Sequence, residues 1–143
     1  MSLSVISKGL SGLVGFFFTF AGVSKTGSAV GIQTVMSDEM QTPFRTGVWS
    51  TIFGLPDLPF LYAVGSTELV TGLGMLGYVI GVTSPQVAQW CAAIAAFITF
   101  NATSAHVVKG DPMANVAFCG TLCTLYTTLN FLIATSRGKS KNE

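Results

Sequence analysis

Charged residues are scarce in this sequence. Asp, Glu, Lys and Arg together make up 9% of its 143 residues, whereas a soluble globular domain carries about 25%. Two long segments, residues 69–108 and 112–136, contain none of the four. This deficit excludes an ordinary soluble domain. A transmembrane helix needs about 20 mostly apolar residues, so the first segment has room for two spans and the second for one.

Several motifs that carry chemistry are also missing. The cysteines Cys91, Cys119 and Cys123 contain no C-x-x-C pair, which a membrane thiol oxidoreductase requires. A single histidine beside one glutamate makes an incomplete metal site. The sequence has no dinucleotide-binding or phosphate-binding glycine motif and no basic stretch suited to nucleic acid. We therefore expect no metal, no cofactor and no nucleic-acid partner.

Turn signals separate the apolar segments. Pro85 in GVTSPQ (residues 81–86) disfavours helical dihedrals at Ser84, so it divides the first segment. Residues 9–24 are also charge-free, and their apolar stretch is longer than the core of about 7 to 15 residues of a signal peptide. We interpret them as a helix, with cleavage after Ala21 as the alternative. The predicted fold is an all-α bundle of four transmembrane helices, at residues 4–25, 60–82, 85–108 and 113–136.

The connection between the first two spans, residues 26–59, is far longer than the usual loop of about 4 to 6 residues. Apolar residues recur in it at every fourth position, which is typical of one helix face, although Pro43 interrupts the pattern. These residues are Ile32, Met36, Met40, Phe44 and Val48. We interpret the segment as a partly helical loop that lies on the membrane surface. A lid or a docking surface is the alternative.

Four antiparallel spans place both termini on one membrane face and the long loop, with the turn at Lys109, on the other. Six polar residues then lie near the loop face and are candidates for a polar pocket: Lys25, Glu68, Asn101, His106, Asp111 and Asn115. Glu68 stands out, because an ionisable group at the centre of a span costs about 2.5 to 3.5 kcal/mol. We favour a structural role for Glu68, with Lys25, His106 or Asn101 as its partner. A proton carrier or a ligand for a polar head group is the alternative.

Small residues predict how the helices pack and turn. Gly77 and Gly81, like Ala92 and Ala96, are spaced by four, which favours close contact between the second and third spans.

The segment HVVKGDP (residues 106–112) predicts the end of one helix and the start of the next. Gly110 can take a left-handed turn conformation, and Pro112 suits the first turn of the last span. Asp111 then falls at the N-cap, where its carboxylate accepts hydrogen bonds from the free amides of that turn.

The order of several short motifs resembles the DoxX-like family of membrane proteins. The motifs are FFFTFAGVSK (16–25), FGLP (53–56), STELVTGLGMLGYVIG (66–81) and AAIAAFITFNATSAHVVKGDP (92–112). The Gly-Asp-Pro after the histidine is closer to the eukaryotic branch that includes a receptor-assembly chaperone. The resemblance implies a four-helix membrane bundle in a family that includes a quinone-linked thiosulfate oxidoreductase subunit and assembly chaperones. It marks Lys25, Glu68 and His106 as the family-like polar positions.

Two functions follow as hypotheses. We favour an accessory subunit or assembly factor that is not catalytic by itself and that contacts membrane lipids and other transmembrane proteins of a larger complex. The alternative is a redox subunit that presents Glu68 and His106 to a quinone, with quinone or lipid as its bound molecule. Four of the seven Lys and Arg residues lie on the side of the termini, which we therefore expect to face the cytoplasm or an equivalent compartment.

Overall fold

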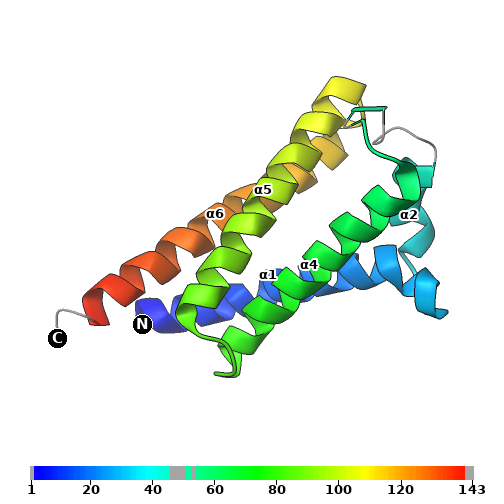
Figure 1. The fold of residues 1–143 in the computed structure, drawn as a ribbon. Coiled ribbons are helices and arrows are strands. Elements are labelled where there is room, and N and C mark those ends of the chain that lie inside the picture. Colours follow the sequence, from blue (N-terminus) through cyan, green and yellow to red (C-terminus); the bar gives the residue numbers. More distant parts are fainter. Residues whose placement is uncertain (1, 46–50, 53, 141–143) are drawn as a thin grey trace.

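The computed structural model describes residues 2–45, 51–52 and 54–140, the side chains of residues 139 and 140 excepted, and these residues form helices and turns without a strand (Figure 1). The helices are α1 (Leu3–Thr26), the 3-10 helix η1 (Gly27–Val30), α2 (Ser37–Arg45), α4 (Asp57–Val79), α5 (Pro85–Lys109) and α6 (Met113–Ser140). The predicted all-α class is confirmed. The four long helices begin and end within a few residues of the predicted bounds.

Three helices are long and apolar enough to cross a membrane: Leu3–Val30, Pro85–Lys109 and Met113–Gly138. They fit a multi-pass membrane protein. The helix α4 is 23 residues long but falls outside this group, because Glu68 and several glycine and hydroxyl residues lower its mean hydropathy. The predicted number of four spans is therefore supported for three helices.

The turns at both ends of α5 follow the local sequence. Ser84 has an extended backbone, with ψ of 155°, and its side chain accepts a hydrogen bond from the Val87 N–H, so α5 begins at Pro85. Gly110 ends the helix with φ of 73°, a left-handed conformation, and its N–H donates to the carbonyls of His106 and Val107. Both turn predictions are confirmed.

The long helices form a closed arrangement in which α1 contacts α4 and α6, and α5 contacts the same two helices. Consecutive long helices run in opposite directions. Both termini therefore lie at one end of the bundle, and α2 and the α5–α6 turn lie at the other (Figure 1). We call these the terminal end and the loop end. Val14, Phe18, Met75 and Tyr126 are buried between the helices, and the Tyr126 hydroxyl donates to the Val14 carbonyl at 3.0 Å, which joins α6 to α1.

Glycines bring α1 and α4 into backbone contact. A Cβ added at Gly22 would lie 2.7 Å from the Gly65 carbonyl oxygen, and one added at Gly72 would lie 2.8 Å from the Gly15 carbonyl oxygen. Each helix thus places two glycines seven residues apart, and they face each other across the antiparallel crossing.

The second and third spans approach closely at Gly74, where an added Cβ would lie 2.5 Å from the Sγ of Cys91, but the predicted role of Gly77 and Gly81 in this contact is wrong. A Cβ added at Gly77 would meet Thr83 of the turn, and Gly81 lies in that turn with φ of 81°. Spacing alone failed here because α4 ends at Val79, before the second glycine of the motif.

The loop predicted at residues 26–59 contains η1 and α2, and α2 packs on the bundle. Gln41 is buried, and its Nε2 donates to the Ser24 carbonyl at 2.8 Å. Phe44 packs on Phe60, with ring centroids 5.4 Å apart. The predicted apolar face is wrong, because α2 buries Ser37, Gln41 and Phe44. Of the apolar residues predicted to share one face, only Phe44 is among these buried residues. Ile32 lies before the helix and is half exposed, and Val48 lies outside the described residues.

Candidate functional site

Lys25 and Glu68 form an ion pair between α1 and α4. The Lys25 Nζ donates to both carboxylate oxygens, at 2.7 Å from Oε1 and 2.6 Å from Oε2. The two side chains are 12% and 6% exposed. Of the three partners that the sequence left open for Glu68, the structure shows Lys25.

The backbone contact at the glycine crossing puts this pair inside the bundle. Lys25 lies one turn beyond Gly22, and Glu68 lies one turn beyond Gly65, the two glycines that face each other. Because both oxygens of the carboxylate bind one ammonium group, each charge compensates the other in a region of low dielectric constant. This arrangement holds two helices together and leaves neither charge isolated.

The α5–α6 turn carries a second polar group, made of His106, Lys109 and Asp111. The Nδ1 of His106 lies 2.7 Å from Asp111 Oδ2, and the Nζ of Lys109 lies 3.1 Å from Oδ1. Since an ionised carboxylate only accepts hydrogen bonds, Nδ1 is the donor. The hydrogen bond from His106, followed by that from Lys109, lowers the pKa of Asp111 below its ordinary value.

The predicted N-cap role of Asp111 is wrong. Both carboxylate oxygens point toward α5 partners, and α6 begins at Met113, one residue later than an N-cap at Asp111 requires. In the first turn of α6 the Asn115 N–H donates instead to the Pro112 carbonyl, at 2.9 Å. A histidine and a lysine within five residues of the carboxylate attract it more strongly than neutral amides do.

The structure places the other two candidates outside these two polar groups. The Asn101 side-chain amide donates to the Phe97 carbonyl at 2.7 Å, and Asn115 is exposed at the start of α6. Four of the six candidates thus form two separate pairs, Lys25 with Glu68 and His106 with Asp111. The other two candidates belong to neither pair. Within residues 2–45, 51–52 and 54–140, no three His, Cys, Asp or Glu residues lie close enough to hold a metal ion.

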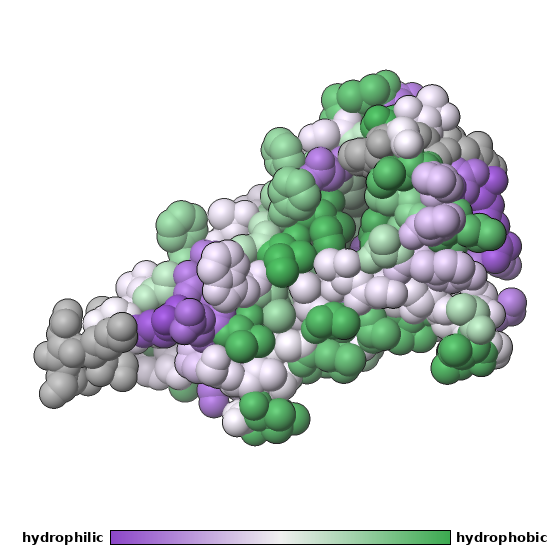
Figure 2. Space-filling model, in the orientation of Figure 1, coloured by the Kyte–Doolittle hydropathy of each residue, from purple (hydrophilic) through white to green (hydrophobic). Residues whose placement is uncertain are grey.

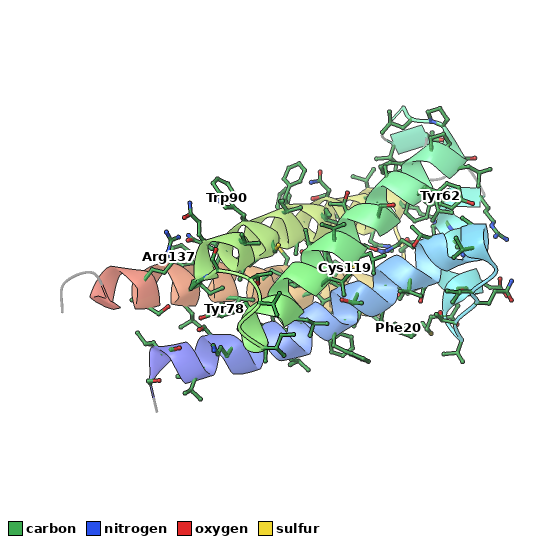
Figure 3. All side chains as sticks on the ribbon, turned by 60° about the horizontal axis from the view of Figure 1, so that its bottom comes forward. Phe20, Tyr62, Tyr78, Trp90, Cys119 and Arg137 are labelled. Carbon is green, nitrogen blue, oxygen red and sulfur yellow. The ribbon has the colours of Figure 1, made fainter. Side chains whose placement is uncertain are left out.

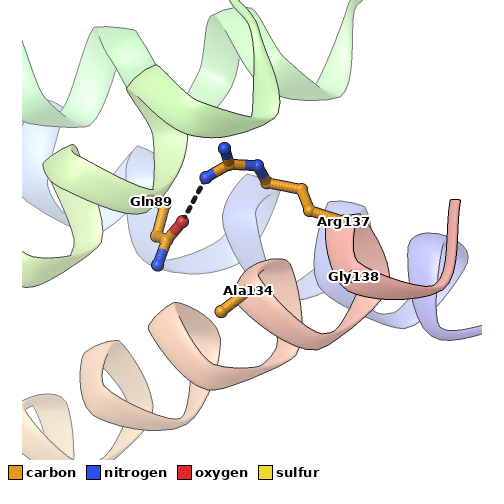
Figure 4. A pocket seen from close by; sticks show the side chains of 4 residues that line it. All are labelled: Gln89, Ala134, Arg137 and Gly138. Atoms are coloured by element: carbon orange, nitrogen blue, oxygen red, sulfur yellow. Dashed lines mark hydrogen bonds between the residues drawn. The ribbon is translucent and has the colours of Figure 1, made fainter. Parts of the chain in front are cut away.

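Sequence reasoning missed a polar cluster at the terminal end. Arg137 Nη1 donates to Gln89 Oε1 at 2.6 Å (Figure 4), and the Asn130 side-chain amide donates to the Gln89 carbonyl at 3.0 Å. Two hollows of about 290 and 300 Å³ adjoin this contact, and Gln89 and Arg137 line both. The sequence did contain a signal for this cluster, because Asn130 and Arg137 are seven residues apart and therefore lie on one face of the helix.

Comparison with known proteins places this architecture in a family. Residues 9–129 match the DoxX-like family, and this range contains all of α4 and α5 and most of α1 and α6. It also contains both polar groups of the loop end. A search of curated proteins finds no match. The resemblance noted in the sequence is confirmed. Since the match covers most of the chain, this membrane protein belongs to the DoxX-like family.

Proposed function

We propose that this protein is an accessory subunit or assembly factor, not catalytic by itself, that crosses the membrane four times and binds a transmembrane helix of another protein through the outward face of α6. The observation that carries the proposal is a run of exposed small and hydroxyl-bearing residues on that face, from Ala117 to Thr128.

The fourth span in this proposal is α4. Its low hydropathy comes partly from Glu68, but that carboxylate is paired with Lys25 inside the bundle. A compensated charge facing the interior is compatible with a membrane-spanning helix. The packing of α4 against both α1 and α5, which are candidate spans themselves, supports the same position.

Part of the outward face of α6 is made of small and hydroxyl-bearing residues. Four of them are exposed and recur every three or four positions: Ala117, Thr121, Thr124 and Thr128. The next exposed residue on this face is Phe131, followed by Thr135. The buried face of the same helix carries Tyr126, Leu129 and Ile133, on the opposite side at 3.6 residues per turn. Small residues and threonines at this spacing allow a neighbouring transmembrane helix to approach closely and to exchange hydrogen bonds.

The outward faces of α1 and α5 differ from that of α6. They expose large apolar side chains, such as Phe16, Trp90 and Phe97, which are 61%, 66% and 70% exposed. In Figure 2, hydrophobic residues cover much of the length of the visible face, and hydrophilic residues gather mainly toward its two ends. Large apolar side chains suit contact with lipid. The run of small and hydroxyl-bearing residues from Ala117 to Thr128 therefore favours that part of α6 as the place where a protein partner binds.

The polar groups of the loop end support a role without chemistry of its own. Both oxygens of Glu68 accept hydrogen bonds from Lys25, and the side chain is only 6% exposed, so little of that carboxylate is accessible to a substrate in this arrangement. The two hollows beside Arg137 lie at the opposite end of the bundle. The ion pair therefore acts as a structural link.

A quinone-linked redox subunit is the second candidate. The observation in its favour is the hydrogen bond from His106 to Asp111 at the end of α5, because a carboxylate that orients a histidine is a common arrangement for proton transfer. A quinol that is oxidised at this membrane face has to release protons, and His106 is placed to accept one.

The experiment compares partner binding by one triple variant of α6 and one double variant of α4. The tagged full-length chain is purified from its own membrane with mild detergent, and stoichiometric partners are quantified by mass spectrometry. We expect Thr121→Leu/Thr124→Leu/Thr128→Leu to lose the partner. Ala63→Leu/Ser66→Leu alters small exposed residues of α4 and should retain it. Equal retention in both variants refutes the α6 interface, and stoichiometric quinone in the purified protein supports the redox role instead.

A further inference from the structure

The polar cluster at the terminal end has an excess of positive charge. The guanidinium of Arg137 contacts only neutral partners, Gln89 Oε1 at 2.6 Å and Gln86 Oε1 at 3.5 Å. In the part of the chain that the structure describes, no carboxylate forms an ion pair with it. A guanidinium that binds only amide oxygens keeps its full charge and several N–H donors for another group.

The acidic residues are segregated from this cluster. The sequence has six, and the five that the structure describes lie in α2, at the start or the midpoint of α4, or in the α5–α6 turn: Asp38, Glu39, Asp57, Glu68 and Asp111. The sixth, Glu143, lies outside the described residues. The described part of the terminal end therefore carries cations without compensating carboxylates, and it attracts anions.

The orientation of the two glutamine side chains makes the cluster a set of donors. Arginine can only donate hydrogen bonds, so the amide oxygens of Gln86 and Gln89 must face Arg137. Their NH₂ groups consequently face away from the guanidinium. Three side chains thus present N–H groups around the two hollows of about 290 and 300 Å³.

The position of the cluster matches the head-group region of a membrane. Arg137 is one residue from the end of the candidate span Met113–Gly138. Trp90 lines one hollow, is exposed to the outside, and lies at the same end of the bundle as Arg137 (Figure 3). Tryptophan and arginine at the end of a span are typical of the interface between lipid and water. Trp90, Ile94 and Phe97 then continue along one exposed face of α5 toward the membrane centre.

We propose that this cluster is a binding site for an anionic phospholipid. Arg137 binds the phosphate of the head group, and the side-chain amides of Gln86 and Gln89 donate further hydrogen bonds to its oxygens. An acyl chain lies along the exposed face of α5 formed by Trp90, Ile94 and Phe97. The site is independent of the α6 interface and of the loop-end polar groups.

Quenching of tryptophan fluorescence tests this site. The chain has two tryptophans, so the Trp49→Phe full-length chain reports on Trp90 alone. It is reconstituted in phosphatidylcholine bilayers that contain phosphatidylglycerol, with bromine on the acyl chains of one lipid or the other. We expect phosphatidylglycerol to be favoured at Trp90 by about ten-fold, the effect of one charge-assisted hydrogen bond.

Three variants separate a specific binding site from a diffuse attraction of charge. Arg137→Gln should reduce the preference to near one. Lys8→Gln removes the same charge from the same end of the bundle, outside the hollows, and should leave the preference within two-fold of the parent. Gln89→Leu keeps the net charge but removes the amide that orients Arg137, and it should lower the preference about three-fold. Equal losses in Arg137→Gln and Lys8→Gln, or no loss in Gln89→Leu, refute the site.

Free phosphate is the other source of the same chemistry. If inorganic phosphate at millimolar concentration displaces brominated phosphatidylglycerol from Trp90, the site binds a soluble phosphate compound, and the lipid proposal is wrong. No displacement supports the lipid. Native mass spectrometry of the wild-type chain, which should retain phosphatidylglycerol in preference to phosphatidylcholine, provides a second measurement that does not depend on Trp49→Phe.

Discussion

The two ends of the bundle use their cations differently. At the loop end, Lys25 binds Glu68 and Lys109 binds Asp111, whereas the exposed Arg45 of α2 donates to the side-chain oxygen of Gln41. At the terminal end, Arg137 binds glutamine amides, and the Lys8 ammonium lies 5.7 Å from the centre of the Tyr78 ring. A cation paired with a carboxylate links two parts of the same chain, whereas a cation that binds neutral partners keeps its charge for groups outside the chain.

The same comparison predicts where substitutions change stability and where they change binding. The paired loop-end charges are buried or lie in a tight turn, so losing one leaves its partner uncompensated. Terminal-end charges are solvated or face head groups, so their loss leaves the fold intact. The four predictions below are ordered from the largest expected effect on stability to the smallest.

The Glu68 substitution should have the largest effect. Glu68→Leu leaves the Lys25 ammonium buried without its counter-ion, and we expect a loss of about 3 to 5 kcal/mol. Glu68→Gln should lose less, because an amide oxygen can still accept from Lys25. Unfolding by heat or by denaturant in lipid bilayers measures both. The double variant Lys25→Met/Glu68→Leu should regain most of the loss, and a Glu68→Leu protein as stable as the wild type contradicts the structural role.

The glycine crossing that encloses the pair is the next most sensitive feature. In Gly22→Ala the new methyl carbon meets the backbone of α4, 2.5 Å from the Leu69 nitrogen, so the helices must separate at a cost of about 1 to 3 kcal/mol. Gly9→Ala on the same helix meets nothing within 4 Å and should be neutral or stabilising by up to about 1 kcal/mol. The same unfolding experiment compares them, and equal effects would falsify the close α1–α4 contact.

The turn at the loop end should show a small effect that depends on pH. The folded state lowers the pKa of Asp111 from its ordinary 3.8 through hydrogen bonds from His106 and then Lys109. Ionised Asp111 therefore contributes stability above pH 3.8, and this contribution disappears as the pH falls through the lowered pKa. Asp111→Asn should be less stable than the wild type at neutral pH, and the difference should shrink in acid. A difference that is constant over this range contradicts the pairing.

Arg137→Gln should change stability least, by less than about 0.5 kcal/mol, because surface substitutions away from buried networks usually have effects of that size. The measurement is the unfolding midpoint in phosphatidylcholine bilayers, where no anionic lipid is present to bind. A destabilisation as large as that of Glu68→Leu would remove the distinction between the two ends, since Arg137 would then be a structural residue.

The candidate site was only partly predictable from the sequence. Glu68 was identifiable because an acidic residue in an apolar helix needs a partner, yet Lys25, His106 and Asn101 all satisfied the depth argument. Only the crossing of α1 and α4 selects Lys25. The role of Asp111 was misassigned because an N-cap position is defined by sequence spacing, while His106 and Lys109 reach the carboxylate through the geometry of the turn.

Local sequence was enough to predict the long helices, the turns on either side of α5 and the membrane character of the chain, because hydrophobic runs, Ser84–Pro85 and Gly110 act on the backbone within a few residues. Tertiary structure alone decided which glycines make contact, which face of α2 is buried and which cation Glu68 binds. It also decided that Gln86 and Gln89 at the start of α5 meet Arg137 at the end of α6. These outcomes depend on how helices far apart in the sequence cross, and local periodicity does not encode the register of a crossing.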